Sequence, residues 1–226
     1  MSSVPRHVGF IVDGNRRWAA ARGRKPHEGH QAGYDALKDV LLETIEHGVY
    51  YASAYVFSTE NWKRSEDEVN RLMTLLLRVL NDDLHIFIER NVRIRVLGTR
   101  ERLSKKVCTA IDRAEAATAD LTSGQALLCL NYGGHQEVVD AVNACVQAEK
   151  GMITTAMIEK HLYAPDVPPC DLIVRTSGEQ RLSNFMLWRS AYSELLFLEK
   201  HWPDMTKNDV TAILEEYARR NRRFGG

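Results

Sequence analysis

Short apolar segments alternate with longer amphipathic segments along most of this chain. Six of the short segments have the length and the branched or aromatic side chains that are typical of buried strands. They lie near residues 8–12, 50–57, 92–98, 126–130, 172–174 and 195–198. Helical patterns fill most of the intervals, and strands that alternate with helices favour a parallel sheet with helices on both faces. The sequence therefore predicts an α/β fold with a central, mostly parallel, six-stranded sheet.

The length and charge of the chain limit its organisation and its partners. A chain of 226 residues without repeats or linkers suits one hydrophobic core, so we expect a single domain over residues 1–226. The 30 Lys and Arg residues balance 30 Asp and Glu residues, whereas a general nucleic-acid binder needs a basic excess. No apolar run approaches the ~18 residues of a membrane span, and the N-terminus lacks an apolar signal-peptide core. We therefore expect a cytoplasmic protein that does not bind nucleic acid.

Polar turns follow four of the predicted strands, at residues 13–15, 58–61, 131–134 and 175–178. Ligands of open parallel sheets bind outside the carboxyl ends of the strands, so these turns predict a single cleft at one edge of the sheet. The chain has no GxGxxG motif after its first strand and no P-loop motif anywhere. These absences disfavour dinucleotide chemistry and P-loop chemistry.

Basic residues gather in three places although the net charge is zero. The clusters are residues 16–25, the pair Arg175 and Arg181, and residues 219–223. Any one cluster could be solvated surface, but three in a neutral chain suggest anion sites sized for phosphates. Asp13 lies beside the first cluster, and an acid among bases suits Mg²⁺ bridging a carboxylate to phosphate oxygens. The alternative for this residue alone is a turn aspartate without a metal.

The helix predicted over residues 66–90 begins at a capping box formed by Ser65 and Glu68. Beyond its main apolar face it carries a second apolar stripe, which consists of Leu75, Val79 and Ile86. The stripe indicates either a helix buried on two sides or a helix that lines an apolar ligand tunnel beside the sheet. Just before this helix, polar side chains lie next to aromatic ones, a mixture that suits a ligand with an apolar body and a charged head. These residues are Phe57, Ser58, Asn61, Trp62 and Arg64.

Five successive motifs resemble those of the cis-prenyltransferase family, of which undecaprenyl diphosphate synthase is the best-known member. They span residues 7–19, 57–69, 131–134, 171–185 and 188–195, and the ending over residues 222–226 also matches. The resemblance implies one catalytic domain that elongates an allylic diphosphate, commonly farnesyl diphosphate, with isopentenyl diphosphate units. The product is a Z-polyprenyl diphosphate, and the expected cofactor is Mg²⁺.

The resemblance also implies a role for each matching residue. Asp13 is the central catalytic residue and a magnesium ligand, Ser58 and Asn61 assist condensation and proton removal, and Glu194 lies near the magnesium of isopentenyl diphosphate. The expected substrate-binding residues are Gly14, Asn15, Arg16, Arg17, His30 and Arg64 for the allylic diphosphate, Trp18 and Phe57 for the prenyl chain, Trp62 beside them, and Arg175, Arg181, Ser183 and Arg223 for isopentenyl diphosphate.

Further implications concern assembly and product. An Arg-x-Gly at this end of the family's chains reaches across a two-fold interface, so we expect a homodimer in which Arg223 completes the site of the second copy. Peripheral contact with a membrane is expected where product is released. Two departures from the family pattern matter: Pro26 replaces a phosphate-binding Arg, and Val56 replaces an Ala that is usual in long-chain members. Val56 could shorten the tunnel, which leaves a short-chain synthase as an alternative. A non-catalytic partner subunit of the same fold is the other alternative.

Overall fold

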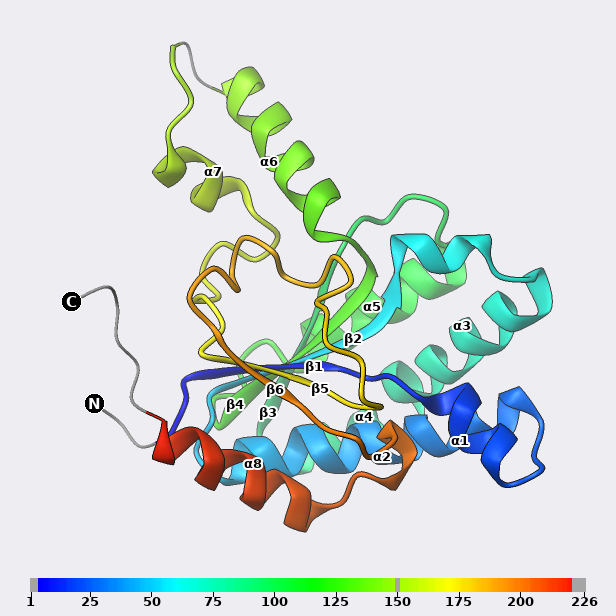
Figure 1. The fold of residues 1–226 in the computed structure, drawn as a ribbon. Coiled ribbons are helices and arrows are strands. Elements are labelled where there is room, and N and C mark those ends of the chain that lie inside the picture. Colours follow the sequence, from blue (N-terminus) through cyan, green and yellow to red (C-terminus); the bar gives the residue numbers. More distant parts are fainter. Residues whose placement is uncertain (1–3, 149–150, 221–226) are drawn as a thin grey trace.

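The computed structural model describes residues 4–148 and 151–220 and contains the predicted six-stranded sheet. The strand order is β3-β4-β2-β1-β5-β6, and every neighbouring pair is parallel (Figure 1). The strands are β1 (His7–Ile11), β2 (Tyr51–Ser58), β3 (Val92–Leu97), β4 (Gly124–Tyr132), β5 (Leu172–Arg175) and β6 (Glu194–Phe197). Every residue of the central strands β1 and β4 is buried, as expected for strands covered on both faces. The predicted fold class is confirmed.

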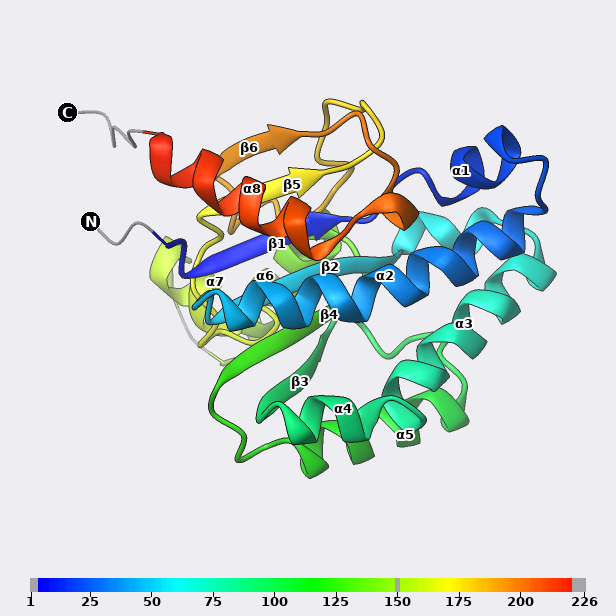
Figure 2. The same cartoon turned by 90° about the horizontal axis from the view of Figure 1, so that it is seen from below.

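Helices cover the sheet unevenly. They are α1 (Asn15–Ala21), α2 (Pro26–Glu46), α3 (Glu66–Asn81), α4 (Leu84–Glu89), α5 (Lys105–Ala117), α6 (Gly134–Ala148), α7 (Thr155–His161) and α8 (Lys207–Arg219), with the 3₁₀ turns η1 (Thr59–Lys63) and η2 (Trp202–Asp204). Residues of α2, α3, α5 and α8 share the larger hydrophobic core, and Figure 2 shows α2 and α8 crossing one face. On the other face the loops before and after β5, over residues 163–170 and 182–186, contribute to a smaller core, with α6 and α7 beside them. None of the helices in the described part of the chain has the length and apolar character to cross a membrane.

The single helix predicted over residues 66–90 is wrong, because α3 ends at Asn81 and α4 begins at Leu84. The amides of Asp82 and Asp83 both donate to the carbonyl of Arg78, which ends the regular helical pattern. The Asp83 carboxylate accepts a hydrogen bond from the Tyr34 hydroxyl and lies 3.4 Å from Lys38 Nζ. The apolar helical pattern of the sequence continues through residues 82–83, but contacts between Asp83 and α2 interrupt the helix there.

His7 is a buried polar residue at the start of β1. Its Nδ1 lies 2.8 Å from the Pro168 carbonyl and its Nε2 lies 2.6 Å from Ser53 Oγ. Burial lowers the pKa of His7 from 6.5 to about 4, so the ring is neutral in the folded protein near pH 7. An unfolded chain returns this histidine to its ordinary pKa.

We expect the folded protein to lose stability as the pH falls from 6.5 towards 4, since only the unfolded state binds a proton on His7 in that window. The shift corresponds to a loss on the order of 3 kcal/mol in the free energy of unfolding. Urea unfolding at pH 7, 6 and 5 should show a weaker pH dependence for His7→Asn than for the wild type. His85→Asn, which changes an exposed histidine, is the control. Parallel curves for the wild type and His7→Asn would contradict this assignment.

Candidate active site

The turn after β1 is held by close backbone packing. Gly14 has φ +101°, and a Cβ there would lie 2.6 Å from Ser177 Oγ, so glycine is required by both conformation and space. A Cβ at Gly29 of α2 would lie 2.0 Å from the carbonyl oxygen of Asn15. The small residues of α2 therefore let α1 approach closely, and this fixes the direction of the turn that carries Asp13.

The Asp13 carboxylate lies among two arginines and one backbone amide. Its Oδ2 is 2.9 Å from Arg175 Nη2 and 3.2 Å from Arg17 Nη2, and its Oδ1 accepts from the Gly14 amide at 2.6 Å. Partial burial raises the pKa of Asp13, but the hydrogen bond and charge of Arg175, with the charge of Arg17, outweigh it. The pKa therefore stays below its ordinary value, and the carboxylate is ionised at neutral pH.

Arg175 connects the turn after β1 to the loop after β5. Only 4% of this residue is exposed. Besides Asp13, its guanidinium donates to Ser183 Oγ at 2.8 Å and to the carbonyl of Arg181. Arg181 itself is exposed and pairs with Glu179, which also lies 2.8 Å from Arg17 Nη1. Arg175 thus orients neighbouring groups, whereas Arg17 and Arg181 present their charge at the surface of the site.

A side-chain hydrogen bond fixes the turn after β2. The Ser58 amide donates to Asn61 Oδ1 at 3.0 Å. Close by, Glu68 Oε1 lies 2.9 Å from Arg64 Nη1 and 3.6 Å from His30 Nε2. Burial lowers the pKa of His30 against the raising effect of the Glu68 charge, which favours the neutral ring.

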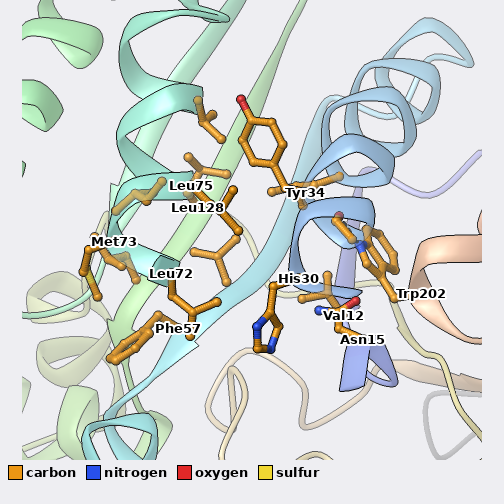
Figure 3. Close-up of a pocket in the computed structure, with 16 residues that line it drawn as sticks. Val12, Asn15, His30, Tyr34, Phe57, Leu72, Met73, Leu75, Leu128 and Trp202 are labelled. Carbon is orange, nitrogen blue, oxygen red and sulfur yellow. Dashed lines mark hydrogen bonds between the residues drawn. The ribbon is translucent and has the colours of Figure 1, made fainter. Parts of the chain in front are cut away.

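Two adjoining cavities of opposite character open at this edge of the sheet. The polar cavity, of about 340 Å³, is lined by Val12, Asp13, Gly14, Asn15, Arg16, Arg17, His30, Tyr55, Val56, Asn61, Arg64 and Leu72. The apolar cavity, of about 70 Å³, lies between α2, α3 and the sheet (Figure 3). Its wall includes Phe57, Leu75, Val79, Leu128 and Trp202. Both cavities share Val12, Asn15, His30, Val56 and Leu72, so a polar chamber borders directly on an apolar one.

Some residues singled out from the sequence lie outside these walls. Trp18 donates to Asp204 Oδ1 at 2.7 Å, and within the described residues it lines neither cavity. Trp62 donates to Asn131 Oδ1 at 2.6 Å and packs edge-on against Phe57. It therefore joins the second turn to the third. Arg223 lies outside the described residues.

Glu194 is separated from Asp13 within one chain. It begins β6 and pairs with Leu172, whereas Asp13 follows the carboxyl end of β1. Three strand residues at ~3.3 Å each place at least ~10 Å between these two levels of the sheet. Glu194 instead lies 3.2 Å from Arg220 Nη1. The two carboxylates of one chain therefore cannot share one ion.

Sequence reasoning missed several residues that shape the site. Thr176 Oγ1 lies 2.7 Å from the Asp13 carbonyl and 3.1 Å from its amide, a role that its place beside Arg175 could have suggested. Tyr34 lines the apolar cavity, and Asn184 bonds to two other turns. No pattern in the sequence indicated either role, apart from the position of each residue near the predicted motifs.

The polar cavity offers few acidic ligands for a magnesium ion. Across residues 4–148 and 151–220 there is no group of three or more His, Cys, Asp or Glu side chains that could hold a metal. Asp13 offers one ionised carboxylate at the polar cavity. Mg²⁺ commonly binds through one or two carboxylates and completes its shell with water and substrate phosphates. The residues therefore fit a magnesium ion shared with a diphosphate.

Comparison with known proteins gives consistent matches over the whole chain. The family model described as "Putative undecaprenyl diphosphate synthase" matches residues 11–225. An isoprenyl transferase of Thermotoga maritima is 43% identical over 99% of this chain and 97% of its own length. A decaprenyl diphosphate synthase of Mycolicibacterium smegmatis is 43% identical over 98% of this chain and 78% of its own.

Solved structures agree with the sequence matches. Lavandulyl diphosphate synthase from Lavandula x intermedia, solved with dimethylallyl diphosphate, superposes with a TM-score of 0.94 at 32% identity over 99% of both chains. A probable undecaprenyl diphosphate synthase from Campylobacter jejuni gives a TM-score of 0.85 at 30% identity over 100% of both chains. The chain therefore belongs to the undecaprenyl diphosphate synthase family of cis-prenyltransferases and is a cis-prenyl diphosphate synthase.

Proposed function

We propose that this enzyme condenses isopentenyl diphosphate with an allylic diphosphate, farnesyl diphosphate being the expected primer, to give a Z-polyprenyl diphosphate. The observation that carries the proposal is the shared border between the polar cavity around Asp13 and the apolar cavity between α2 and α3. A substrate with a charged head and a hydrocarbon tail matches that arrangement. The diphosphate would bind in the polar cavity, and the tail would extend past Val56 into a tunnel that begins at the apolar one.

The cationic residues of the polar cavity would bind and orient the allylic diphosphate. Arg16, Arg17 and Arg64 line it together with the backbone of Gly14. Mg²⁺ held by Asp13 would, when bound, supply positive charge to the departing diphosphate. In the reaction the allylic carbon–oxygen bond breaks, a carbon–carbon bond to the isopentenyl unit forms, and that unit loses a proton. Ser58 and Asn61 would lie near these reacting carbons.

Isopentenyl diphosphate would bind beside the loop that follows β5. Arg181 and Ser183 would contact its diphosphate. Arg175, which is hydrogen-bonded to Asp13 and Ser183, would orient these two side chains. The proposal includes a homodimer in which Arg223 reaches the site of the second copy. Because Glu194 is remote from Asp13 within one chain, its proposed place near magnesium also requires a second copy. We further propose a cytoplasmic enzyme that touches a membrane only where product is released.

The test is direct incubation of the pure protein with farnesyl diphosphate, labelled isopentenyl diphosphate and Mg²⁺, followed by sizing of the products. Elongated products with cis double bonds support the proposal, and chelation of Mg²⁺ should abolish them. Condensation that requires a second kind of chain would instead identify a partner subunit. Product length must be measured, since one relative is a decaprenyl synthase and one structural neighbour is a lavandulyl diphosphate synthase.

We expect Val56 to limit product length, because it lines both cavities beside Leu72. A growing chain needs an apolar path, since exposure of each CH₂ to water costs about 0.8 kcal/mol. Val56→Ala should therefore lengthen the product and Val56→Phe should shorten it, as measured by chromatography of the dephosphorylated lipids. Leu75 and Val79 of the predicted stripe also line the apolar cavity, whereas Ile86 is outside its described wall.

The matched control for Val56 is Val69→Ala in α3. Val69 is buried in the same core but lies outside the described walls of both cavities. That variant should lose stability and keep the wild-type product distribution. If both Val56 variants also keep it, another residue sets the length.

A further inference from the structure

The loop after β5 adopts a backbone conformation that most residues avoid. Ser183, Asn184 and Met186 have φ of +48°, +67° and +45°. The left-handed region costs a non-glycine residue roughly 1–2 kcal/mol, and asparagine is among the residues that tolerate it best. Three such residues within four positions persist only when surrounding contacts hold them.

Asn184 makes contacts of that kind with two other turns of the site edge. Its carbonyl accepts from the Gly134 amide at 2.7 Å, and its Oδ1 accepts from the His135 amide at 2.8 Å. Its Nδ2 donates to Glu60 Oε1 at 2.9 Å. One side chain therefore ties the loop after β5 to the turn after β4 and to η1 after β2.

The glycines of the third turn make this approach possible. A Cβ at Gly133 would lie 2.8 Å from Asn184 Nδ2, and a Cβ at Gly134 would lie 3.1 Å from the Asn184 carbonyl oxygen. Both glycines thus leave space for a residue that belongs to a different turn. The third turn lines neither cavity in the described part of the chain, so it affects the site through its contacts with other turns, and Asn184 makes its contacts with the loop after β5.

The residue next to Asn184 belongs to the proposed isopentenyl diphosphate site. Ser183 accepts from Arg175, and Arg175 is bound to Asp13. We infer that Asn184 is a positioning residue that fixes Ser183 and Arg181 relative to Asp13 by locking three turns together. This inference rests on the proposed function, because it assigns a kinetic consequence to the loop that would hold isopentenyl diphosphate.

The test exchanges the hydrogen-bond donor and acceptor between Asn184 and Glu60. Asn184→Asp keeps a side chain that tolerates the left-handed region and still accepts from His135, but it sets two carboxylates against each other. We expect kcat/KM for isopentenyl diphosphate to fall about tenfold, mainly through KM, because small misplacements of binding groups are costly. The KM for the allylic diphosphate should change little.

The double variant Asn184→Asp with Glu60→Gln should restore the wild-type kinetics to within about threefold, since the Gln amide can now donate to the new carboxylate. Glu60→Gln alone keeps an acceptor for Asn184 and should stay near wild type. Rescue by the reversed pair identifies the bond itself as the cause. A double variant as impaired as Asn184→Asp would overturn the inference.

Asn91 provides the matched control. It is also an asparagine with positive φ, +55°, and its Nδ2 also joins neighbouring residues, at 3.2 Å from Thr122 Oγ1 and 2.9 Å from Ser123 Oγ. It precedes β3 and so lies at the opposite edge of the sheet. The Thr122 and Ser123 hydroxyls can donate to the carboxylate of Asn91→Asp, so this variant makes the same substitution without opposed carboxylates and should leave the kinetics unchanged.

A second readout does not depend on activity. Asn184→Gly accommodates the left-handed backbone but removes the acceptor for the His135 amide, so hydrogen exchange at His135 should accelerate at least about tenfold, as expected for a lost bond of about 1.4 kcal/mol. Unchanged protection at His135 overturns the inference even if the wild type makes no product. If the wild type is active and Asn184→Asp has the same kinetics as Asn91→Asp, the inference is overturned as well. If the wild type is inactive but His135 loses its protection in Asn184→Gly, the result counts against the proposed function alone.

Discussion

Replacing Asp13 with alanine should reduce turnover by more than ~10²-fold, as the removal of a group that stabilises developing charge typically does. The carboxylate lies 2.9 Å from Arg175 and lines the polar cavity where the diphosphate is proposed to bind. Its loss removes the proposed magnesium ligand and also leaves the Arg175 charge buried without its partner. Steady-state kinetics with both substrates, with circular dichroism to confirm folding, would measure the effect.

Two further variants separate chemistry from stability at Asp13. Asp13→Asn keeps an oxygen for the Gly14 amide but carries no charge, so we expect it to fold and to be nearly as inactive as the alanine variant. Asp204→Asn alters a carboxylate that accepts from Trp18 and Arg22 and lines neither cavity in the described residues. This control should stay within about threefold of wild type. Near-normal turnover in Asp13→Asn would remove Asp13 from the mechanism.

Arg175→Met should lower kcat by about 10²-fold or more and should also change the pH dependence of the reaction. Partial burial raises the pKa of Asp13, and Arg175 is the main group that holds it down. Without Arg175 that pKa rises, so Asp13 takes up a proton at a higher pH than in the wild type. The acid limb of the profile of kcat/KM against pH should therefore move to higher pH.

Arg175→Lys distinguishes charge from geometry. A single ammonium keeps a positive charge near Asp13 but cannot reproduce the fork that reaches Asp13, Ser183 and the Arg181 carbonyl together. We expect a wild-type acid limb with low kcat. Arg95→Met, which removes an arginine paired to Asp166 from the edge strand β3, is the control and should leave the profile unchanged. An unshifted limb in Arg175→Met would show that Asp13 does not govern it.

Much of the fold was predictable because its determinants are local. Apolar runs of strand length, separated by helical patterns, identify β1 to β6, and polar residues at strand ends identify the edge where the site forms. The separation of Glu194 from Asp13 could also have been predicted from the sequence. A residue that precedes a parallel strand lies at the amino edge, whereas one that follows a strand lies at the carboxyl edge.

The remainder depends on contacts between residues that are distant in the sequence. The break after α3 follows from Tyr34 and Lys38 holding Asp83, which a helical pattern does not encode. The orientation of Arg175 towards Asp13 is fixed by the pairing of β5 with β1. Asn184 resembles any polar turn residue until the turns after β2 and β4 lie beside it.

The position of β1 between β2 and β5 dictates the order in which the molecule can form during synthesis. Asp13 leaves the ribosome early, but Arg175 follows 162 residues later. At roughly 5–20 residues per second the delay is about 8 to 30 seconds. Until then β1 can pair with β2 while its other edge, whose backbone N–H and C=O groups pair with β5 in the finished sheet, has no strand beside it. Open strand edges can pair with other chains. The incomplete chain is therefore the form that is most prone to aggregation and most in need of chaperones.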